Sequence, residues 1–501
     1  MKAMILLLVS LFTLNTWADL STAFLVVRVD IEKELNAIDA HSDTPEVSLN
    51  ALRTSLHKLT SFKDEVFAPA ILARESQAPL NGLTLTRIHS YLKIHLTILE
   101  RGLSLIDALE EQETDVDDKA MAMMALSLLH HFDTYLEDDH LRRLLSKKDE
   151  AYDLKARALK KAYTRLTNKK VQKRVKRMIK AEVLSPAEIA AHKAYEDMWK
   201  PARKAFRGDF WSRFKSFVVH HISGGVGNSA GSVKFRKGTM WQDFELEAQV
   251  QAMLQPMDII TEKTPFILTD RLIPGHFGHN ALWLGTPAQL KTLGIWDAPY
   301  MKPFQAAIEE GYTIIETSRS GTQLKKLSDW MNIDEIAIIR RDDRATTPSA
   351  INEFYAVLMA QHGKTYDFNF DVETTDKLVC SELLYQTYGD VIWPTEAYLG
   401  RFTISPDNVA EIIAQKNTPF KLLFSMERNE DQVEVFKNTA ELTAQLGYTL
   451  NGIDDDGQEI LEKQTLTCIE RVVEGGKKVK TCIKTWLRPV FGGKTLRRFE
   501  F

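Results

Sequence analysis

The sequence predicts an α+β protein, in which an N-terminal all-helical domain is followed by a mixed domain. Between about residues 20 and 205, proline and glycine are scarce, and apolar residues recur every three or four positions. From about residue 251, short apolar or β-branched runs alternate with turns and amphipathic stretches, which is typical of strands and helices in one domain. A length of 501 residues with 44% hydrophobic residues allows two or three domains with substantial cores.

The first residues predict an export signal. Lys2 precedes an apolar run over 4–14, and the small residues Thr16 and Ala18 come just before Asp19. A charged start, an apolar run too short to span a bilayer and small residues before the cleavage point are typical of a cleaved signal. We therefore expect residues 1–18 to be removed and the protein to be periplasmic or secreted. No later stretch reaches 18 uninterrupted apolar residues, so we expect no transmembrane segment in the mature chain.

The segment 19–205 is predicted to be a helical bundle, with its clearest periodicity over 84–109 and 120–145. Within it, residues 142–180 hold sixteen lysines or arginines and still keep an apolar stripe, which predicts a basic helix. A solvated basic face explains this composition, and so does attraction to an anionic envelope surface, so both interpretations stay open. The net charge of −4 gives no indication of nucleic acid as a partner.

Two further segments flank the mixed domain. Residues 206–250 are aromatic and then glycine-rich, and they lack the G-K-[S/T] ending of a phosphate loop, so we expect a connector. Residues 426–501 are predicted to be a β-rich extension with a hairpin that turns about Gly475. Such a hairpin places Cys468 and Cys482 opposite or nearly so, which predicts a disulfide between them. Cys380 is then the only free thiol in an oxidising compartment.

Cys380 is the candidate nucleophile because it lies where a helix is predicted to begin. A helix N-terminus presents free N–H groups and partial positive charge, which favour a thiolate. His279 opens a predicted strand and can act as base, and Glu316 lies late in the apolar run 312–317, where it can orient the imidazole. The backbone N–H of Cys380 and the hydroxyl of Tyr366 are the expected oxyanion donors. The other interpretation of Cys380 is a buried structural cysteine.

From spacing alone, two alternatives compete with this triad. His276 lies three residues before His279 and offers a second candidate base. His276, His279 and Cys380 also match the three protein ligands of a catalytic zinc site. We expect neither a metal nor another cofactor.

The motifs resemble those of circularly permuted papain-like amidases, the YiiX/YebB-like branch of the NlpC-type cysteine peptidases. They are, in chain order, Asp258-Ile-Ile, Gly278–Gly285, Ile315-Glu316, Gly363–Asp367 and Val379–Leu383. In that family the histidine precedes the cysteine, begins a strand of small and apolar residues, and is followed by a carboxylate on the next strand. The resemblance favours His279 over His276, and assigns Glu316 and Cys380 to the triad. Met257 departs from the glycine that the family usually has before the aspartate.

The resemblance covers about residues 250–415 and implies a permuted papain-like (NlpC-type) domain over 251–425. This domain is expected to hold a small antiparallel sheet and a helix that carries the nucleophile. The implied function is that of an exported cysteine amidase or peptidase, which forms a thioester acyl-enzyme on cell-wall peptide. The alternatives are a hydrolase or acyltransferase acting on lipid acyl esters or amides, and a non-catalytic envelope-binding protein on the same fold.

Overall fold

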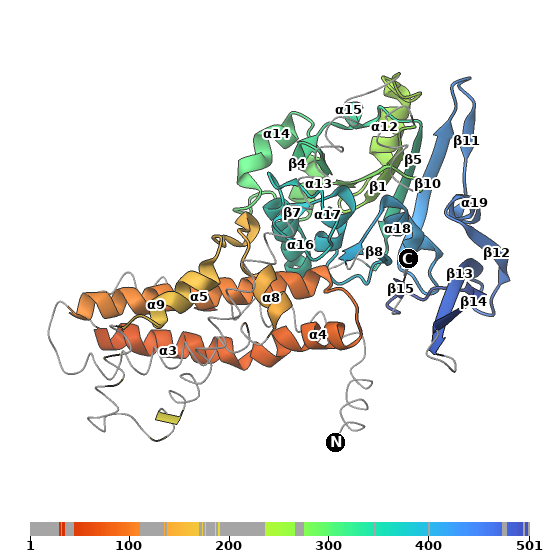
Figure 1. Ribbon diagram of the computed structural model, residues 1–501. Coiled ribbons are helices and arrows are strands. Elements are labelled where there is room, and N and C mark those ends of the chain that lie inside the picture. The colour runs from red at the N-terminus through yellow and green to blue at the C-terminus, as the bar shows by residue number, and fades with distance from the viewer. Residues whose placement is uncertain are drawn as a thin grey trace. The chain divides into compact units, whose positions relative to one another are not determined.

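Figure 1 shows the computed structural model of the chain, whose contacts divide it into two units. The first unit is Met1–Leu80 with Thr84–Val219, and the second is Asn81–Leu83 with His220–Phe501. The structure describes residues 30–31, 33–35, 45–110, 135, 138–169, 173, 176, 186, 189–190, 236–265, 275–343, 347–398, 401–472, 478–493 and 496–498. The predicted signal 1–18, most of the predicted helix 120–145 and the glycine-rich run 222–232 lie outside these residues. Among the described helices, none is long and apolar enough to cross a membrane.

The described part of the first unit consists of helices joined by turns. They are α3 (Pro45–Ser61), α4 (Lys63–Glu75), most of α5 (Gly82–Glu110), α8 (Asp139–Leu144), η1 (Glu150–Tyr152) and α9 (Ala158–Leu166). The periodicity over 84–109 predicts α5 correctly, since Leu85, Ile88 and Leu92 are fully buried on one stripe. Phe67 contacts Tyr91 and Tyr135 edge to face, with ring centroids 5.3 and 5.8 Å apart.

The prediction of one basic helix over 142–180 is wrong. Helix α8 ends at Leu144, and Asp153 and Arg157 adopt left-handed conformations before α9 begins. The Asp149 carboxylate accepts a hydrogen bond from the Ala151 N–H at the start of η1, so a local side-chain cap turns the chain where a helix would continue. Attraction of this segment to an anionic envelope surface stays a prediction.

The second unit is built on a seven-stranded antiparallel sheet with the strand order β11-β10-β5-β1-β2-β3-β4. Its strands are β1 (Ile259–Lys263), β2 (His279–Trp283), β3 (Ile314–Ser318), β4 (Gly321–Lys325), β5 (Glu335–Arg341), β10 (Phe420–Arg428) and β11 (Glu434–Phe436). The small antiparallel sheet implied by the resemblance is therefore larger than expected. Residues 426–436 belong to this sheet, so the predicted extension does not begin at residue 426.

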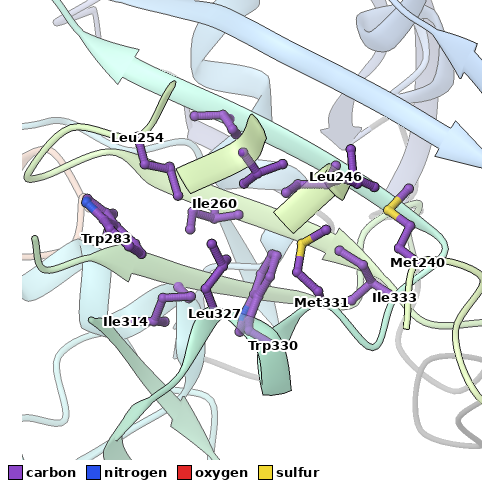
Figure 2. Close-up of a cluster of buried hydrophobic side chains, with 14 of the residues drawn as sticks. Met240, Leu246, Leu254, Ile260, Trp283, Ile314, Leu327, Trp330, Met331 and Ile333 are labelled. Carbon is purple, nitrogen blue, oxygen red and sulfur yellow. The ribbon is translucent and has the colours of Figure 1, made fainter. Parts of the chain in front are cut away.

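Helix α12 (Phe244–Met253) covers one face of this sheet. Asp243 caps the helix by accepting the Leu246 N–H at 3.0 Å. Leu246 and Val250 pack against Ile260, Trp283 and the other members of a buried apolar cluster (Figure 2). Met240, Leu246 and Val250 therefore belong to the core, and the predicted connector over 206–250 is wrong for residues 240–250. Few residues of α12, among them Leu246 and Val250, form its buried apolar stripe. So short a periodic pattern is hard to recognise next to a stretch rich in aromatic residues.

Helix α17 (Cys380–Thr387) contacts strands β2 and β3. Asn280 alternates with Ala281 along β2 and so points away from the α12 face. Its side-chain amide donates to the Ser381 hydroxyl on α17 at 2.9 Å. The remaining helices of this unit are α13 (Pro287–Thr292), η2 (Lys302–Phe304), α14 (Gln305–Glu309), α15 (Leu327–Trp330), α16 (Pro348–Ala360), α18 (Pro406–Ala410), η3 (Glu411–Ala414) and α19 (Thr439–Gln445).

Three smaller sheets complete the unit. Strands β6 (Thr365–Tyr366) and β7 (Lys377–Leu378) pair in parallel, β8 (Thr395–Tyr398) lies between β9 (Arg401–Thr403) and β15 (Leu496–Arg498), and β12 (Tyr448–Ile453), β13 (Glu459–Val472) and β14 (Lys478–Leu487) form a third sheet. In the β13–β14 register Cys468 lies opposite Cys482, as the hairpin prediction requires. The disulfide itself stays a prediction, and the turn about Gly475 lies outside the described residues.

Candidate active site

His279 and Glu316 are brought together by two neighbouring strands. Glu316 on β3 is directly opposite Ala281 on β2, and His279 is two residues before Ala281, so both side chains lie on one face. The Nε2 of His279 lies 2.9 Å from Oε2 of Glu316, whose side chain is 2% exposed. The sequence predicts this pair, and the antiparallel register explains how it forms.

The second ring nitrogen of His279 is left for Cys380, the first residue of α17. Burial by itself would raise the pKa of the Cys380 thiol. The charge of His279 and a hydrogen bond from its ring outweigh this effect and lower that pKa. Conversely, burial would lower the pKa of His279, but the thiolate and Glu316 raise it well above its usual value. The geometry can therefore hold a thiolate–imidazolium pair.

Two further groups bind the sulfur, and the sequence analysis missed both. The backbone N–H of Asn280 donates to the sulfur. The pairing of β2 with β3 extends only to Ala281, so the Asn280 N–H is not used by β3. The Ser381 hydroxyl lies 3.8 Å from Sγ. Because Ser381 Oγ already accepts the Asn280 amide, its own hydrogen is available to the sulfur. Asn280 follows His279, and Ser381 follows Cys380, so adjacency to the predicted pair is the signal that could have identified them.

The Glu316 carboxylate is held by three donors in total. Gln323, opposite it on β4, donates to Oε1 at 3.3 Å, and the Lys325 ammonium lies 3.4 Å from the same oxygen. Burial would raise the pKa of Glu316, but these contacts and the His279 bond lower it to about 2. The carboxylate is therefore ionised at neutral pH and can fix the imidazole orientation.

This juxtaposition of thiol, imidazole and carboxylate, with histidine before cysteine in the chain, is the arrangement that the motifs predict. Residues 253–440 match the family described as permuted papain-like amidase enzyme, YaeF/YiiX, C92 family. The predicted resemblance is thereby confirmed for this part of the chain, and the family supports a cysteine hydrolase. Neither the curated proteins nor the solved structures include a match.

In the permuted papain-like domain, the Cys-Ser-Glu run also shapes the start of α17. The Glu382 carboxyl accepts the Val379 N–H at 2.8 Å, so it caps the helix from inside. Burial, followed by the charge of Asp367, raises the pKa of Glu382 well above its usual value.

Tyr366 lies near the sulfur through the parallel pairing of β6 with β7. It is opposite Leu378, two residues before Cys380, and its ring contacts Phe368 at a centroid distance of 5.0 Å. Burial and then the Cys380 charge raise the pKa of its phenol, so the hydroxyl keeps its proton and can donate. Among the described residues, no hydrogen bond occupies this hydroxyl. An oxyanion role for Tyr366 stays a prediction.

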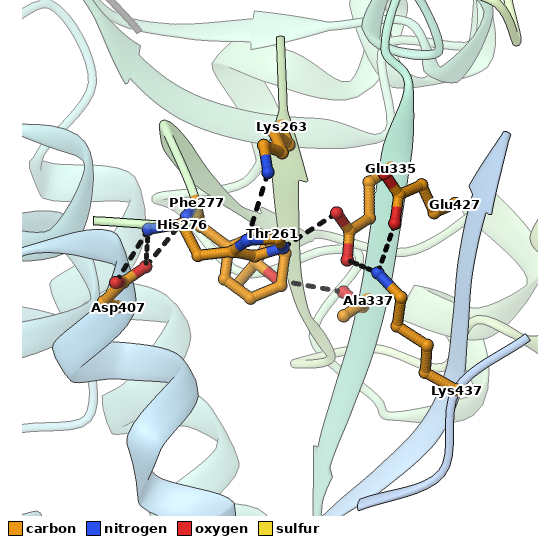
Figure 3. Close-up of polar contacts among 9 residues, drawn as sticks. All are labelled: Thr261, Lys263, His276, Phe277, Glu335, Ala337, Asp407, Glu427 and Lys437. Carbon is orange, nitrogen blue, oxygen red and sulfur yellow. Dashed lines mark hydrogen bonds and ion pairs between the residues drawn. The ribbon is translucent and has the colours of Figure 1, made fainter. Parts of the chain in front are cut away.

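His276, the competing base, faces other partners (Figure 3). Its Nε2 lies 2.8 Å from Oε2 of Glu335, and its Nδ1 lies 3.1 Å from Nζ of Lys263. The ammonium of Lys263 can only donate, so it occupies the lone pair of Nδ1. The structure therefore does not place His276 beside Cys380. Among the described residues, no group of three histidine, cysteine or acidic side chains could hold a metal ion.

The His276 contacts anchor the loop that leads into β2. Lys437 bridges Glu335 and Glu427 at 2.7 and 2.6 Å, and Asp407 on α18 accepts the backbone N–H groups of His276 and Phe277 at 2.8–3.0 Å (Figure 3). These contacts fix the backbone just before His279. They hold the candidate base in position without touching its ring.

Proposed function

We propose that the permuted papain-like domain is a cysteine amidase or peptidase that works through a thioester acyl-enzyme. The observation that carries the proposal is the His279 imidazole, which lies between the Cys380 thiol and the Glu316 carboxylate. Cys380 is the nucleophile, His279 the general base and acid, and Glu316 the group that orients His279.

In the acylation step, the Cys380 thiolate attacks the carbonyl carbon of the amide, and the C=O electron pair becomes an oxyanion. The Cys380 backbone N–H, which has no intrahelical partner at this position, and the Tyr366 hydroxyl donate to that oxygen. Collapse of the intermediate breaks the C–N bond, and the His279 imidazolium gives its proton to the departing amine. The products of this step are a free amine and a thioester on Cys380.

In the deacylation step, neutral His279 takes a proton from water, and the resulting hydroxide attacks the thioester carbonyl. The C–S bond then breaks, which releases a carboxylic acid and restores the Cys380 thiolate beside protonated His279. Glu316 stabilises the imidazolium in both steps, because its carboxylate remains ionised and bound to Nε2.

The substrate that we propose is the peptide part of the cell wall, reached after export by the predicted signal 1–18. The amidase description of the matching family supports an amide bond as the target. The signal-like N-terminus supports the compartment.

The test combines a thiol-directed activity probe with two substrate classes. The probe is expected to label Cys380 in the wild-type protein and to leave Cys380→Ala unlabelled. Purified peptidoglycan fragments are expected to lose an amide bond in the presence of the wild-type protein only, as followed by mass spectrometry. Cleavage of acyl lipids instead would replace the peptide substrate with a lipid one. A folded protein whose Cys380 is not labelled would refute both enzymatic readings.

A further inference from the structure

Arg319 carries a buried cationic N–H group with no partner. Its Nη1 is inaccessible to solvent and has no hydrogen-bond acceptor, and no described carboxylate forms an ion pair with the side chain. The nearest carboxylate in sequence, Glu316, is already taken by His279, Gln323 and Lys325. An unpaired buried donor costs free energy, and such groups in native structures call for an explanation such as a ligand.

The turn that carries Arg319 joins β3 to β4 and is held in place. Ser318 pairs with Gly321 across the turn, and Gln323 donates to Ser318 as well as to Glu316. A side chain at Gly321 would meet the Lys364 carbonyl oxygen at 2.5 Å, and φ there is +103°, so this position requires glycine. The turn follows directly after β3, the strand that carries Glu316, and these contacts fix its backbone.

The same turn lies against the segment that leads to the sulfur. The Thr322 N–H donates to the Lys364 carbonyl, and the Gly363 N–H donates to the Thr322 carbonyl, both at 2.8 Å. Tyr366 follows two residues after Lys364 and lies opposite Leu378, just before Cys380. Burial and the negative charge of the Cys380 thiolate raise the pKa of the Tyr366 phenol, and the positive charge of Arg319 acts in the opposite direction. Arg319 and Cys380 are therefore both close to Tyr366.

We propose that Arg319 is a substrate-binding residue that pairs with a carboxylate of the substrate next to the scissile amide. This inference rests on the proposed function and narrows its substrate class to amides that carry an anionic side chain or terminus. A guanidinium presents planar paired donors that match a carboxylate, and the pairing is stronger where water is excluded. The Arg319 side chain is half-buried, so part of its guanidinium is open to a substrate carboxylate, and the Nη1 donor turns towards that acceptor on binding.

The test uses two peptidyl acyloxymethyl ketones that alkylate a catalytic cysteine and differ only in glutamate or glutamine next to the reactive carbon. A second pair carries the same difference one residue further away. The rate of Cys380 labelling is measured by mass spectrometry of the intact protein. In the wild-type protein, at least one glutamate probe is expected to react about tenfold or more faster than its glutamine partner, the effect of one charge-assisted contact.

Arg319→Met is expected to bring this ratio to about one, and Arg319→Lys to an intermediate value. Because both probes of a pair use the same sulfur, the ratio is insensitive to a general change in thiol reactivity. The matched control Lys302→Met removes an exposed cation elsewhere in the unit and should keep the wild-type ratio. The unfolding temperature of Arg319→Met should equal or exceed that of the wild-type protein, since the variant loses an unpaired buried group.

Three outcomes would overturn the inference while leaving the proposed function intact. They are a ratio near one for both pairs in the wild-type protein, a wild-type ratio in Arg319→Met, and a marked fall in the unfolding temperature of that variant, which would make Arg319 structural. Absence of Cys380 labelling by every probe would instead refute the proposed function, and this inference with it.

Discussion

Two histidine–glutamate pairs lie near the start of β2, and they differ in the group that faces the second ring nitrogen of the histidine. His279 contacts Glu316 at 2.9 Å, and His276 contacts Glu335 at 2.8 Å, in both cases through Nε2. Beyond its ring, His279 meets the Cys380 thiol, whereas His276 meets the Lys263 ammonium. Both glutamates have a lowered pKa, so the carboxylates do not distinguish the pairs.

The comparison shows that a histidine held by a carboxylate is not by itself a candidate base. The lone pair of His276 Nδ1 is occupied by the Lys263 ammonium. Its partner Glu335 also accepts from Lys437, so the charges around His276 are paired with one another. His279 has a group on its far side that can exchange a proton with it. We therefore expect replacement of His279 to change catalysis and thiol reactivity, and replacement of His276 to change the free energy of unfolding.

The largest expected effect comes from replacing each histidine by alanine. His279→Ala should lower amide hydrolysis by about a thousandfold, the usual scale for losing a general acid and base. It should also shift the pH dependence of Cys380 alkylation by iodoacetamide. In the wild-type protein the lowered pKa of the thiol keeps it reactive below the usual thiol range, and reactivity falls only as pH falls through that lowered pKa. In the variant, burial is left to raise the pKa.

His276→Ala is the matched variant and should leave the alkylation profile in place. Its cost should appear in the free energy of unfolding, at about 2 kcal/mol, because it leaves buried Glu335 without one of its donors. A thousandfold loss of hydrolysis in both variants with unchanged stability would contradict the distinction between the pairs.

A smaller effect is expected from replacing each glutamate by glutamine. Glu316→Gln should reduce hydrolysis by about 10- to 100-fold, since a neutral amide orients the ring poorly and does not stabilise the imidazolium. Glu335→Gln should instead destabilise the fold by about 3 kcal/mol, because buried Lys437 loses the fully buried one of its two carboxylate partners. Enzyme assays and urea unfolding separate the two effects. Equal losses of hydrolysis and of unfolding free energy in the two variants would contradict the distinction between the pairs.

The two glutamates should also affect how the free energy of unfolding changes at acidic pH. The folded pKa of Glu316 is about 2, below its ordinary value of 4.5, so its contribution to stability is present above about pH 4.5 and is lost as pH falls towards 2. Glu335 has a lowered pKa and therefore a contribution of the same sign. Each variant should lose part of the wild-type decline in unfolding free energy over this acidic range.

The smallest expected effect concerns the donors to the sulfur. Ser381→Ala removes a hydroxyl that can donate to the thiolate, and alkylation near neutral pH should slow about fivefold, the scale of one net hydrogen bond of about 1 kcal/mol. Thr387→Val is the control, because it removes a buried hydroxyl of the same helix that donates to the Leu383 carbonyl instead. Equal alkylation of the wild-type protein and Ser381→Ala would remove Ser381 from the set of donors.

The sequence predicts much of the fold of the second unit, because the relevant signals are local. A strand beginning at His279, a run of apolar residues ending at Glu316 and a helix beginning at Cys380 can each be read within about ten residues. The proximity of Cys380, His279 and Glu316 then follows from the family motifs and their order. The long helix α5 is equally evident from its periodicity.

The remainder depends on contacts between distant segments, which carry no local signal. Strand β10 pairs with β5 from about 80 residues further along the chain, so its place in the sheet was missed. Helix α12 joins the core because its buried residues pack against apolar side chains on one face of the sheet. Arg319 and Gln323 follow Glu316 in sequence, but their importance becomes visible only when the Glu316 partners and the buried Nη1 are known.

The strand order also bears on the route by which the chain folds. His279 and Glu316 are 37 residues apart and lie on consecutive strands, whereas Ser381 meets Asn280 across 101 residues and Lys437 meets Glu335 across 102. Closing a longer loop costs more entropy, which favours early formation of the local β2–β3 pairing. On such a route the imidazole is oriented before the helix with the sulfur docks. The nascent chain then carries an ordinary thiol until the final stage of its folding.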